Sequence, residues 1–99
     1  MRKAILLNSN DNVATLLDNT FANEDVEIID TKNSVISVIR SLDFIPRGHK
    51  IALKNIPEGE NIIKYGFVIG CATKDIKSCQ YVHVHNLSSL RGRGDLAWK

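Results

Sequence analysis

The chain has 99 residues, enough for one domain with a modest hydrophobic core and too few for a second. Hydrophobic residues make up 43% of it and charged residues 24%, which is typical of globular proteins. The formal net charge is only +2 and few aromatic residues lie among the basic ones, which argues against a nucleic-acid-binding surface. The apolar run Ala4–Leu7 is too short for a signal-peptide core or a membrane span, so we expect a cytoplasmic protein without membrane contact.

The first half of the chain predicts short strands. Lys3–Leu7 and the β-branched segment Val26–Ile29 are both typical of strands. Val13–Leu17 is ambiguous, because its apolar residues have helical spacing and Asp11 could cap a helix. The apolar residues within Val35–Ile39 also fit a helix face, but their β-branching favours a strand with a bulge.

A turn motif repeats in the middle of the chain. Ile45-Pro46-Arg47-Gly48 and Ile56-Pro57-Glu58-Gly59 share the pattern I-P-x-G at an interval of eleven residues. Proline suits the second position of a tight turn, and glycine accepts the conformation that closes it. Short strands are predicted after these turns: His49–Leu53, Asn61–Lys64, Phe67–Ile69 and Tyr81–His85. The pattern predicts an all-β fold, a barrel or clip with tight Pro/Gly turns and little helix.

The end of the chain differs in character from the rest. Residues 1–87 form the predicted domain, and Ser88–Lys99 is predicted to be an arm, flexible or bound to a partner. Arg91-Gly92-Arg93 lies in this arm and fits a solvated or partner-bound segment better than a phosphate site. Cys71 and Cys79 have no metal-binding or redox spacing, so we expect free thiols.

His83-Val84-His85-Asn86 gives the sharpest local signal. If this segment is a strand, side chains alternate and His83 and His85 point to the same face. Two imidazoles on one face can share a divalent metal or bind a carboxylate. The simpler alternative is a pair of half-exposed histidines on a sheet surface.

Two further segments contain cationic groups beside turns. In Gly48-His49-Lys50 a rigid turn would fix the position of a histidine and a lysine for a ligand, although His49 could merely pack and Lys50 be solvated. In Lys64-Tyr65-Gly66 the lysine could pair with a substrate carboxylate, and Gly66 permits positive φ or a close ligand. Tyr65 could equally be an aromatic at the edge of the core.

Motifs of several enzyme classes are absent from the sequence. It contains no glycine-rich phosphate loop, no nucleophile elbow and no zinc-binding helix motif. The carboxylates lie mainly in predicted turns without an obvious pairing. The predicted site is therefore rich in His and Lys and poor in acids, which is typical of half a site.

Three ordered motifs resemble one known family. Ile45–Leu53, Ile63–Thr73 and Val82–Leu87 resemble the patterns I-P-x-G-H-K-x-A-L, I-x-K-Y-G-x-x-I-G-x-A and H-x-H-N of the N-terminal domain of altronate and galactarate dehydratases. Asp11-Asn12-Val13-Ala14 matches a D-N-V-A near the start of that domain. The likeness covers nearly the whole chain, although the region before Ser34 matches only loosely.

The resemblance implies a fold and an activity. In this family the domain is an SAF-type β-clip, sometimes encoded as a small subunit beside a large catalytic one, and the present chain resembles that separate form. Sulfolactate sulfo-lyase is similar in its two-part arrangement. The implied reaction eliminates water from a sugar acid, so cationic groups or a metal must stabilise an enediolate.

The resemblance also implies roles for individual residues. His83 and His85 would face the substrate or a metal, with His49 as neighbour, and Lys64 or Lys50 would pair with a substrate carboxylate. The remaining substrate-binding candidates come from the same motifs: Gly48, Tyr65, Gly66 and Asn86. The implied cofactor is a divalent metal, iron by family resemblance, shared with the large subunit; imidazole ligands alone do not select the metal.

Three functional hypotheses follow. The first is a small subunit of an altronate- or galactarate-type dehydratase, inactive alone because the general base and acid come from the large subunit. The second is the same arrangement acting on a sulfonated acid, with sulfite as leaving group. The third is a non-catalytic SAF-like module that binds a carbohydrate or a protein. An isolated domain could also form a homodimer through unpaired strand edges.

Overall fold

The computed structural model describes residues 1–89, which form nine β-strands and no helix. The expected all-β fold is therefore confirmed, while its finer description as a β-clip stays a prediction. Because there is no helix in residues 1–89, none of them forms a helix that could span a membrane. The strands are β1 (Arg2–Ile5), β2 (Val13–Leu16), β3 (Asp25–Ile29), β4 (Val35–Arg40), β5 (Lys50–Ala52), β6 (Asn61–Lys64), β7 (Phe67–Ala72), β8 (Tyr81–Val82) and β9 (Leu87–Ser89).

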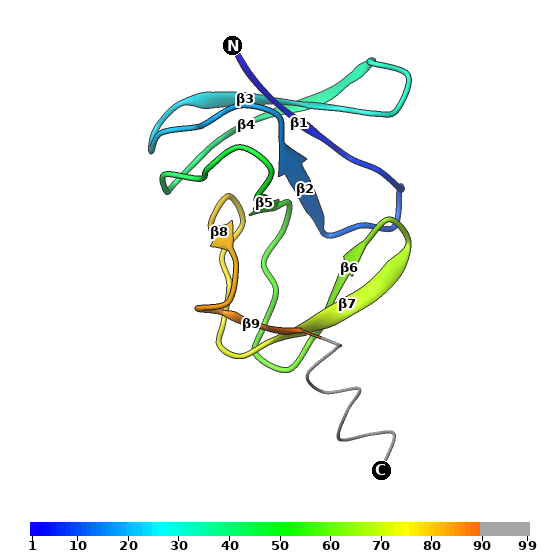
Figure 1. Cartoon of the computed structure of the whole chain (residues 1–99), viewed down its shortest axis with the longest axis vertical. Coiled ribbons are helices and arrows are strands. Elements are labelled where there is room, and N and C mark those ends of the chain that lie inside the picture. Colours follow the sequence, from blue (N-terminus) through cyan, green and yellow to red (C-terminus); the bar gives the residue numbers. More distant parts are fainter. Residues whose placement is uncertain (90–99) are drawn as a thin grey trace.

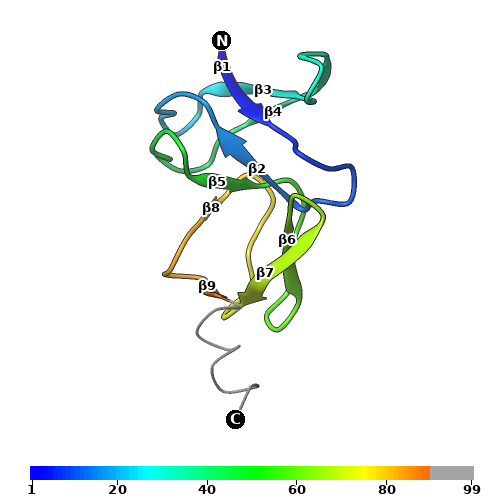
Figure 2. The ribbon, with the colours of Figure 1, turned by 45° about the vertical axis from the view of Figure 1, so that its right-hand side comes forward.

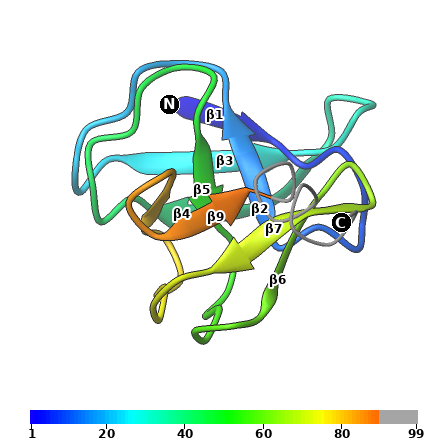
Figure 3. The same cartoon turned by 60° about the horizontal axis from the view of Figure 1, so that its bottom comes forward.

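The strands form two sheets (Figure 1). The larger sheet has the order β4-β3-β1-β2-β5-β8 and the smaller one the order β6-β7-β9. Within residues 1–89 the pairing of β1 with β3 is parallel, and every other strand pairing is antiparallel. Figure 2 shows β1 to β5 in the upper half of the molecule and β6, β7 and β9 in the lower half, and Figure 3 shows β9 beside β7.

Two hydrophobic cores lie on opposite faces of the strands that join the halves. Side chains alternate along a strand, so neighbouring residues of β5 enter different cores. Ile51 lies in the first core and Ala52 in the second, and both are fully buried. In the same way, Tyr81 of β8 packs against the first core while Val82 is buried in the second. The pair β5–β8 is therefore fixed from both faces.

A bridge followed by a tight turn occurs four times in the described chain. The bridges pair Thr20 with Ile45 and Ile56 with Ile76. Each turn is closed by a backbone hydrogen bond, as from His49 N to Pro46 O at 3.1 Å. Proline is thus the first residue of its turn, not the second as the sequence suggested. The third residue of each turn has positive φ: Asn23 (71°), Gly48 (84°), Gly59 (86°) and Cys79 (74°).

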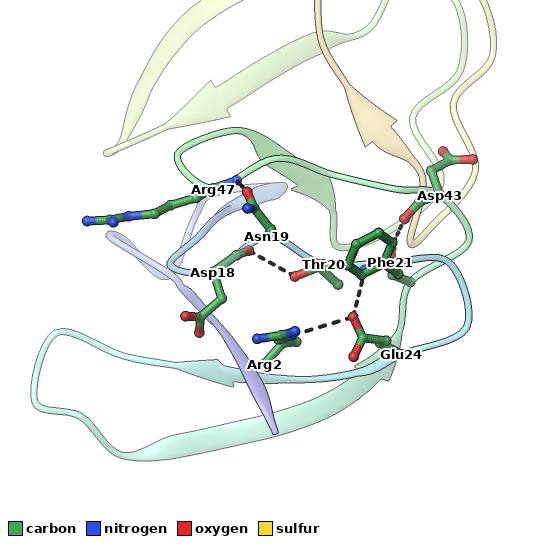
Figure 4. A network of polar contacts seen from close by, with 9 residues as sticks. Arg2, Asp18, Asn19, Thr20, Phe21, Glu24, Asp43 and Arg47 are labelled. Atoms are coloured by element: carbon green, nitrogen blue, oxygen red, sulfur yellow. Dashed lines mark hydrogen bonds and ion pairs between the residues drawn. The ribbon is translucent and has the colours of Figure 1, made fainter.

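Side chains hold these turns together in pairs. The Asn19 side chain accepts a hydrogen bond from Arg47 N, at 2.9 Å, so the turn that ends at His49 is tied to the residue before Thr20. Figure 4 shows this contact beside the Glu24 carboxylate, which accepts hydrogen bonds from Phe21 N and Arg2 Nε. The Phe21 N–H, and then the Arg2 charge, lower the pKa of Glu24.

Asp11 and Asn12 attach the β6–β7 hairpin to the larger sheet. The Asn12 side chain is buried, accepts a hydrogen bond from Ile63 N at 2.8 Å and donates one to Asn61 O at 2.9 Å. The Asp11 carboxylate accepts hydrogen bonds from Tyr65 N and Gly66 N, both at 2.8 Å. These two backbone amides form a small anion-binding nest at the hairpin tip.

The structure corrects some of the predicted elements and confirms one. Asp11 caps no helix, because the ambiguous segment after it is the strand β2. The bulge expected in β4 is confirmed, since Ile28 pairs with Ser37 and Ile29 with Val35. The strand predicted to reach His85 ends at Val82, and the β7 strand continues to Ala72.

The C-terminal boundary was also placed too early. Ser88 pairs with Cys71 in β9, so it belongs to the smaller sheet and not to an arm. The prediction of an arm now concerns residues 90–99, which lie outside the described residues, as does the Arg91-Gly92-Arg93 cluster. Cys71 and Cys79 are free thiols, as expected.

We predict that Asn12→Ala destabilises the protein by about 1–3 kcal/mol, because it leaves the Ile63 N–H and the Asn61 carbonyl of β6 without their buried side-chain partner. The free energy of unfolding from urea titration would measure the loss. Asn10→Ala is the matched control: this side chain is exposed, so the change should stay within about 0.5 kcal/mol. Equal stabilities of the two variants would contradict the proposed attachment of the hairpin.

Candidate functional site

The register of β5 and β8 brings two of the predicted histidines together. Lys50 lies opposite Val82 and Ile51 opposite Tyr81. Extending this register by one residue places His49 opposite His83. Directly opposed side chains in an antiparallel pair lie in contact distance, and the centroids of the two imidazole rings are 4.7 Å apart.

Tyr81 lies at the centre of the histidines. Its hydroxyl is 2.6 Å from His49 Nδ1, and its ring stacks on that of His83 with an interplanar angle of 9°. The His85 ring is 5.3 Å from the Tyr81 ring, centroid to centroid. The structure thus brings all three predicted histidines around one phenol; we call His49, Tyr81, His83 and His85 the imidazole cluster.

The sequence did not single out Tyr81. A usable signal was present, because Tyr81 precedes His83 by two residues and therefore shares its face in an extended segment. What the sequence could not give was the partner strand. Only the pairing with β5 shows that the hydroxyl of Tyr81 reaches His49.

A turn, not strand alternation, positions His83 and His85. Residues 83–86 form a turn in which Asn86 N and Leu87 N both donate to His83 O, at 3.0 and 2.9 Å. The buried Asn86 side chain accepts a hydrogen bond from His83 N and donates one to Tyr81 O. Asn86 was predicted to bind substrate, but both its amide oxygen and its amide nitrogen are used to hold the turn.

The outer edge of β8 is closed by two side chains. Tyr81 N and Tyr81 O both bond to side chains rather than to a further strand. Asp43 accepts from Tyr81 N at 2.8 Å, and Asn86 donates to Tyr81 O at 2.8 Å. The strand that carries Tyr81 is therefore fixed along both edges, which limits the motion of the cluster.

Lys50 and Lys64 add charge next to the cluster. Alternation along β5 turns Lys50 to the face opposite His49. Burial lowers the pKa of Lys50, and the charge of Lys64 at the end of β6 lowers it further. The two lysines are thus within electrostatic range of each other. Of the two, Lys50 also acts on the cluster, because its charge lowers the pKa of His83.

The electrostatics of the site favour an anion. Partial burial lowers the pKa of His83 first, and the nearby His49, Lys50 and His85 lower it further. Within residues 1–89 no carboxylate hydrogen bonds or pairs with these histidines or with Lys50 and Lys64. A bound carboxylate would relieve this concentration of positive charge through charge-assisted hydrogen bonds.

The other predicted residues have structural positions. Gly48 closes the turn before His49 with φ of 84°. Tyr65 and Gly66 form the two-residue tip of the β6–β7 hairpin, both with positive φ, and their amides bind Asp11. Among the described contacts, none joins Tyr65 or Gly66 to the imidazole cluster.

The ligand set does not fit a complete metal site in this chain. Within residues 1–89 no group of three or more His, Cys, Asp or Glu side chains is arranged to hold a metal ion. Lys50 is within electrostatic range of His83, and its charge opposes cation binding there. Further ligands would have to come from another polypeptide.

Comparison with known proteins gives a family match over almost the whole chain. The family described as altronate/galactarate dehydratase SAF domain matches residues 2–90. Altronate dehydratase of Bacillus subtilis (strain 168) is 38% identical over 86 residues, which cover 87% of this chain and 16% of that protein.

Subunits of another lyase are also similar. The (2R)-sulfolactate sulfo-lyase subunit alpha of Chromohalobacter salexigens is 43% identical over 49 residues, covering 50% of this chain and 52% of the subunit. That of Paracoccus pantotrophus is 36% identical over 64 residues, covering 65% of this chain and 94% of the subunit. The chain thus spans one sixth of the Bacillus relative and about half of the Chromohalobacter relative.

We predict that His83 makes stability depend on pH. Its pKa in the folded state lies below the ordinary value of 6.5, so near that pH the unfolded chain binds more protons. The contribution is fully present above pH 6.5 and is lost as the pH falls through the folded pKa. Urea titrations between pH 8 and pH 5 should show this loss in the parent and a smaller one in His83→Gln. The same pH dependence in both proteins would contradict the assignment.

Proposed function

Because the chain belongs to the altronate/galactarate dehydratase SAF domain family, we propose that it is the small subunit of a sugar-acid dehydratase and supplies one half of a carboxylate-binding site. The observation that carries this proposal is the imidazole cluster. Three histidines meet around Tyr81 without a carboxylate partner in residues 1–89, and the neighbouring Lys50 adds positive charge.

The proposed task of the cluster is to bind and polarise the substrate carboxylate. Removal of the proton next to a carboxylate builds negative charge on its oxygens, and fixed donors stabilise that charge. When Tyr81 donates to His49 Nδ1, the neutral imidazole carries its hydrogen on Nε2 and offers it to a ligand. His83 and His85 supply further donors, and Lys50 and Lys64 supply charge that acts over a longer range.

We propose that a large catalytic subunit completes the site. His85 is exposed, and Val84 between the two histidines is 76% exposed, which suits a surface that a second polypeptide covers. The chain covers 94% of a sulfo-lyase subunit alpha, a relative that is itself a subunit. General base and leaving-group acid would come from the large subunit, and the cytoplasm stays the predicted compartment.

A divalent metal, iron by family resemblance, remains part of the proposal only at the contact with the large subunit. There His83 and His85 would be two of its ligands, and the metal would act as a Lewis acid on the substrate carboxylate.

Homodimer formation by the isolated chain also stays a prediction. The strand β4 lies at the edge of the larger sheet, and its side chains Val35, Ile36 and Val38 are about half exposed.

The similarity to sulfolactate sulfo-lyase subunits supports a second candidate, elimination of sulfite from a sulfonated acid. Both substrates carry a carboxylate next to the carbon that loses its proton. The imidazole cluster alone could bind the carboxylate of either substrate. Groups beside the cluster therefore have to distinguish the sugar acid from the sulfonated acid.

We predict that the 99-residue chain binds D-glycerate at the imidazole cluster. In NMR titrations at pH 7, His49→Ala or His83→Ala should weaken binding about tenfold, because each removes a hydrogen-bond donor to the charged carboxylate. Binding should strengthen as the pH falls from 8 to 6, since protonated His83 attracts the anion more strongly. Lys32→Met, in an exposed turn, is the control. Unchanged affinity in both histidine variants would refute the anion site.

We predict that lyase activity requires the large subunit. The pure chain should show no turnover of D-altronate, D-galactarate or 3-sulfolactate, whereas the complex with a co-expressed large subunit should be active on at least one. His83→Gln with His85→Gln should lower kcat/KM of the complex at least a hundredfold while the subunits still co-purify. Metal analysis of both complexes would show whether the histidines retain the ion. Full activity of the double variant would favour a non-catalytic binding module.

A further inference from the structure

A polar cleft of about 390 Å³ lies directly beside the imidazole cluster. Tyr81 and His85 belong to both, so the two sites are continuous. The remaining residues that line the cleft come from the outer edge of β8 and the loops next to it: Asp43, Lys74, Asp75, Gln80 and Asn86.

Two carboxylates of the cleft are held in place with one oxygen still available. Asp43 Oδ2 accepts from Tyr81 N and Asp75 Oδ1 from Glu58 N, both at 2.8 Å. Figure 4 shows the Asp43 carboxylate pointing away from the polar network around Thr20 and Glu24. No described hydrogen bond uses the second oxygen of either side chain within residues 1–89. Each is a fixed acceptor, whose side chain loses little further freedom when a ligand binds.

The cleft also contains donors. Gln80 Oε1 accepts from Lys77 N at 2.8 Å, which fixes the side chain and leaves its NH₂ group for a ligand. Lys74 is exposed at the cleft, and no described ion pair engages it within residues 1–89. Acceptors and donors side by side match hydroxyl groups, which donate and accept at the same time.

We propose that this cleft binds the hydroxyl-bearing carbon chain of a substrate whose carboxylate lies at the imidazole cluster. The inference rests on the proposed function and makes it more specific. It assigns Asp43 and Asp75 as acceptors for substrate hydroxyls and Gln80 as a donor, and so makes these residues determinants of specificity rather than catalytic residues.

The charge of the cleft distinguishes the two substrate classes. Two carboxylates face one lysine, so a second anionic group on the substrate would meet net negative charge. A short sulfonated acid carries such a group and has no long chain of hydroxyls. The cleft therefore favours a polyhydroxylated acid of the altronate type over a three-carbon sulfonated acid.

NMR titration of the ¹⁵N-labelled 99-residue chain with D-altronate, D-glycerate and 3-sulfolactate tests the proposal. All three should shift the amides of His49 and His83, but only D-altronate should also shift those of Lys74, Asp75 and Gln80. D-altronate should bind at least fivefold more tightly than D-glycerate. Asp43→Asn with Asp75→Asn should abolish this advantage and leave D-glycerate affinity within twofold, because asparagine keeps the oxygen that accepts from the backbone.

Asp75→Asn alone, at an exposed position, provides a second variant should the double change weaken the fold. Glu60→Gln, which removes one exposed carboxylate outside the cleft, is the charge control and should change nothing. Equal affinity for D-altronate and D-glycerate, with shifts confined to the imidazole cluster, would overturn the cleft proposal and leave the carboxylate site intact. Absence of shifts at His49 and His83 with every probe would overturn both.

Discussion

The pairing of β5 with β8 is the constraint on which the candidate site depends. The two strands are short, yet each contributes a side chain to both hydrophobic cores. A slip of one residue would move Ile51 and Ala52 into each other's core and would separate His49 from His83, so core packing and site geometry select the same register. The Asp43 and Asn86 side chains close the outer edge of β8 and remove the remaining freedom.

The charge distribution around the imidazole cluster indicates which kind of ligand it can bind. Partial burial lowers the pKa of His83, and the neighbouring His49, Lys50 and His85 lower it further. Such an arrangement slightly destabilises the folded protein, and it favours the binding of an anion. The same charges argue against a divalent metal held by this chain alone. The proposed half-site for a carboxylate, completed by a second polypeptide, agrees with both observations and with the family match.

The motifs shared with the dehydratase family have two different tasks. Asp11 and Asn12 of the D-N-V-A motif are buried and attach the β6–β7 hairpin, whose Tyr65 and Gly66 amides bind Asp11. Those motifs therefore explain the fold. Within residues 1–89 the imidazole rings at positions 49, 83 and 85 contact Tyr81, those of His49 and His83 also contact each other, and none of the three hydrogen bonds to a backbone group. A motif match by itself does not separate these roles, because both kinds of residue lie within the matched motifs.

The sequence by itself determined the all-β class, the two proline-glycine turns and the bulge in β4, because β-branching and turn residues act over a few neighbours. It also identified three histidines that do meet. It missed the turns that close at Asn23 and Cys79, since neither carries the proline-glycine signature. It also extended β8 through His85, because alternation in sequence does not reveal that Asn86 folds the segment back. Only the tertiary structure determined the roles of Tyr81 and Asp43 and the position of the cleft beside them. Their significance comes from partners 32 and 38 residues away, and local patterns contain no information on contacts of that range.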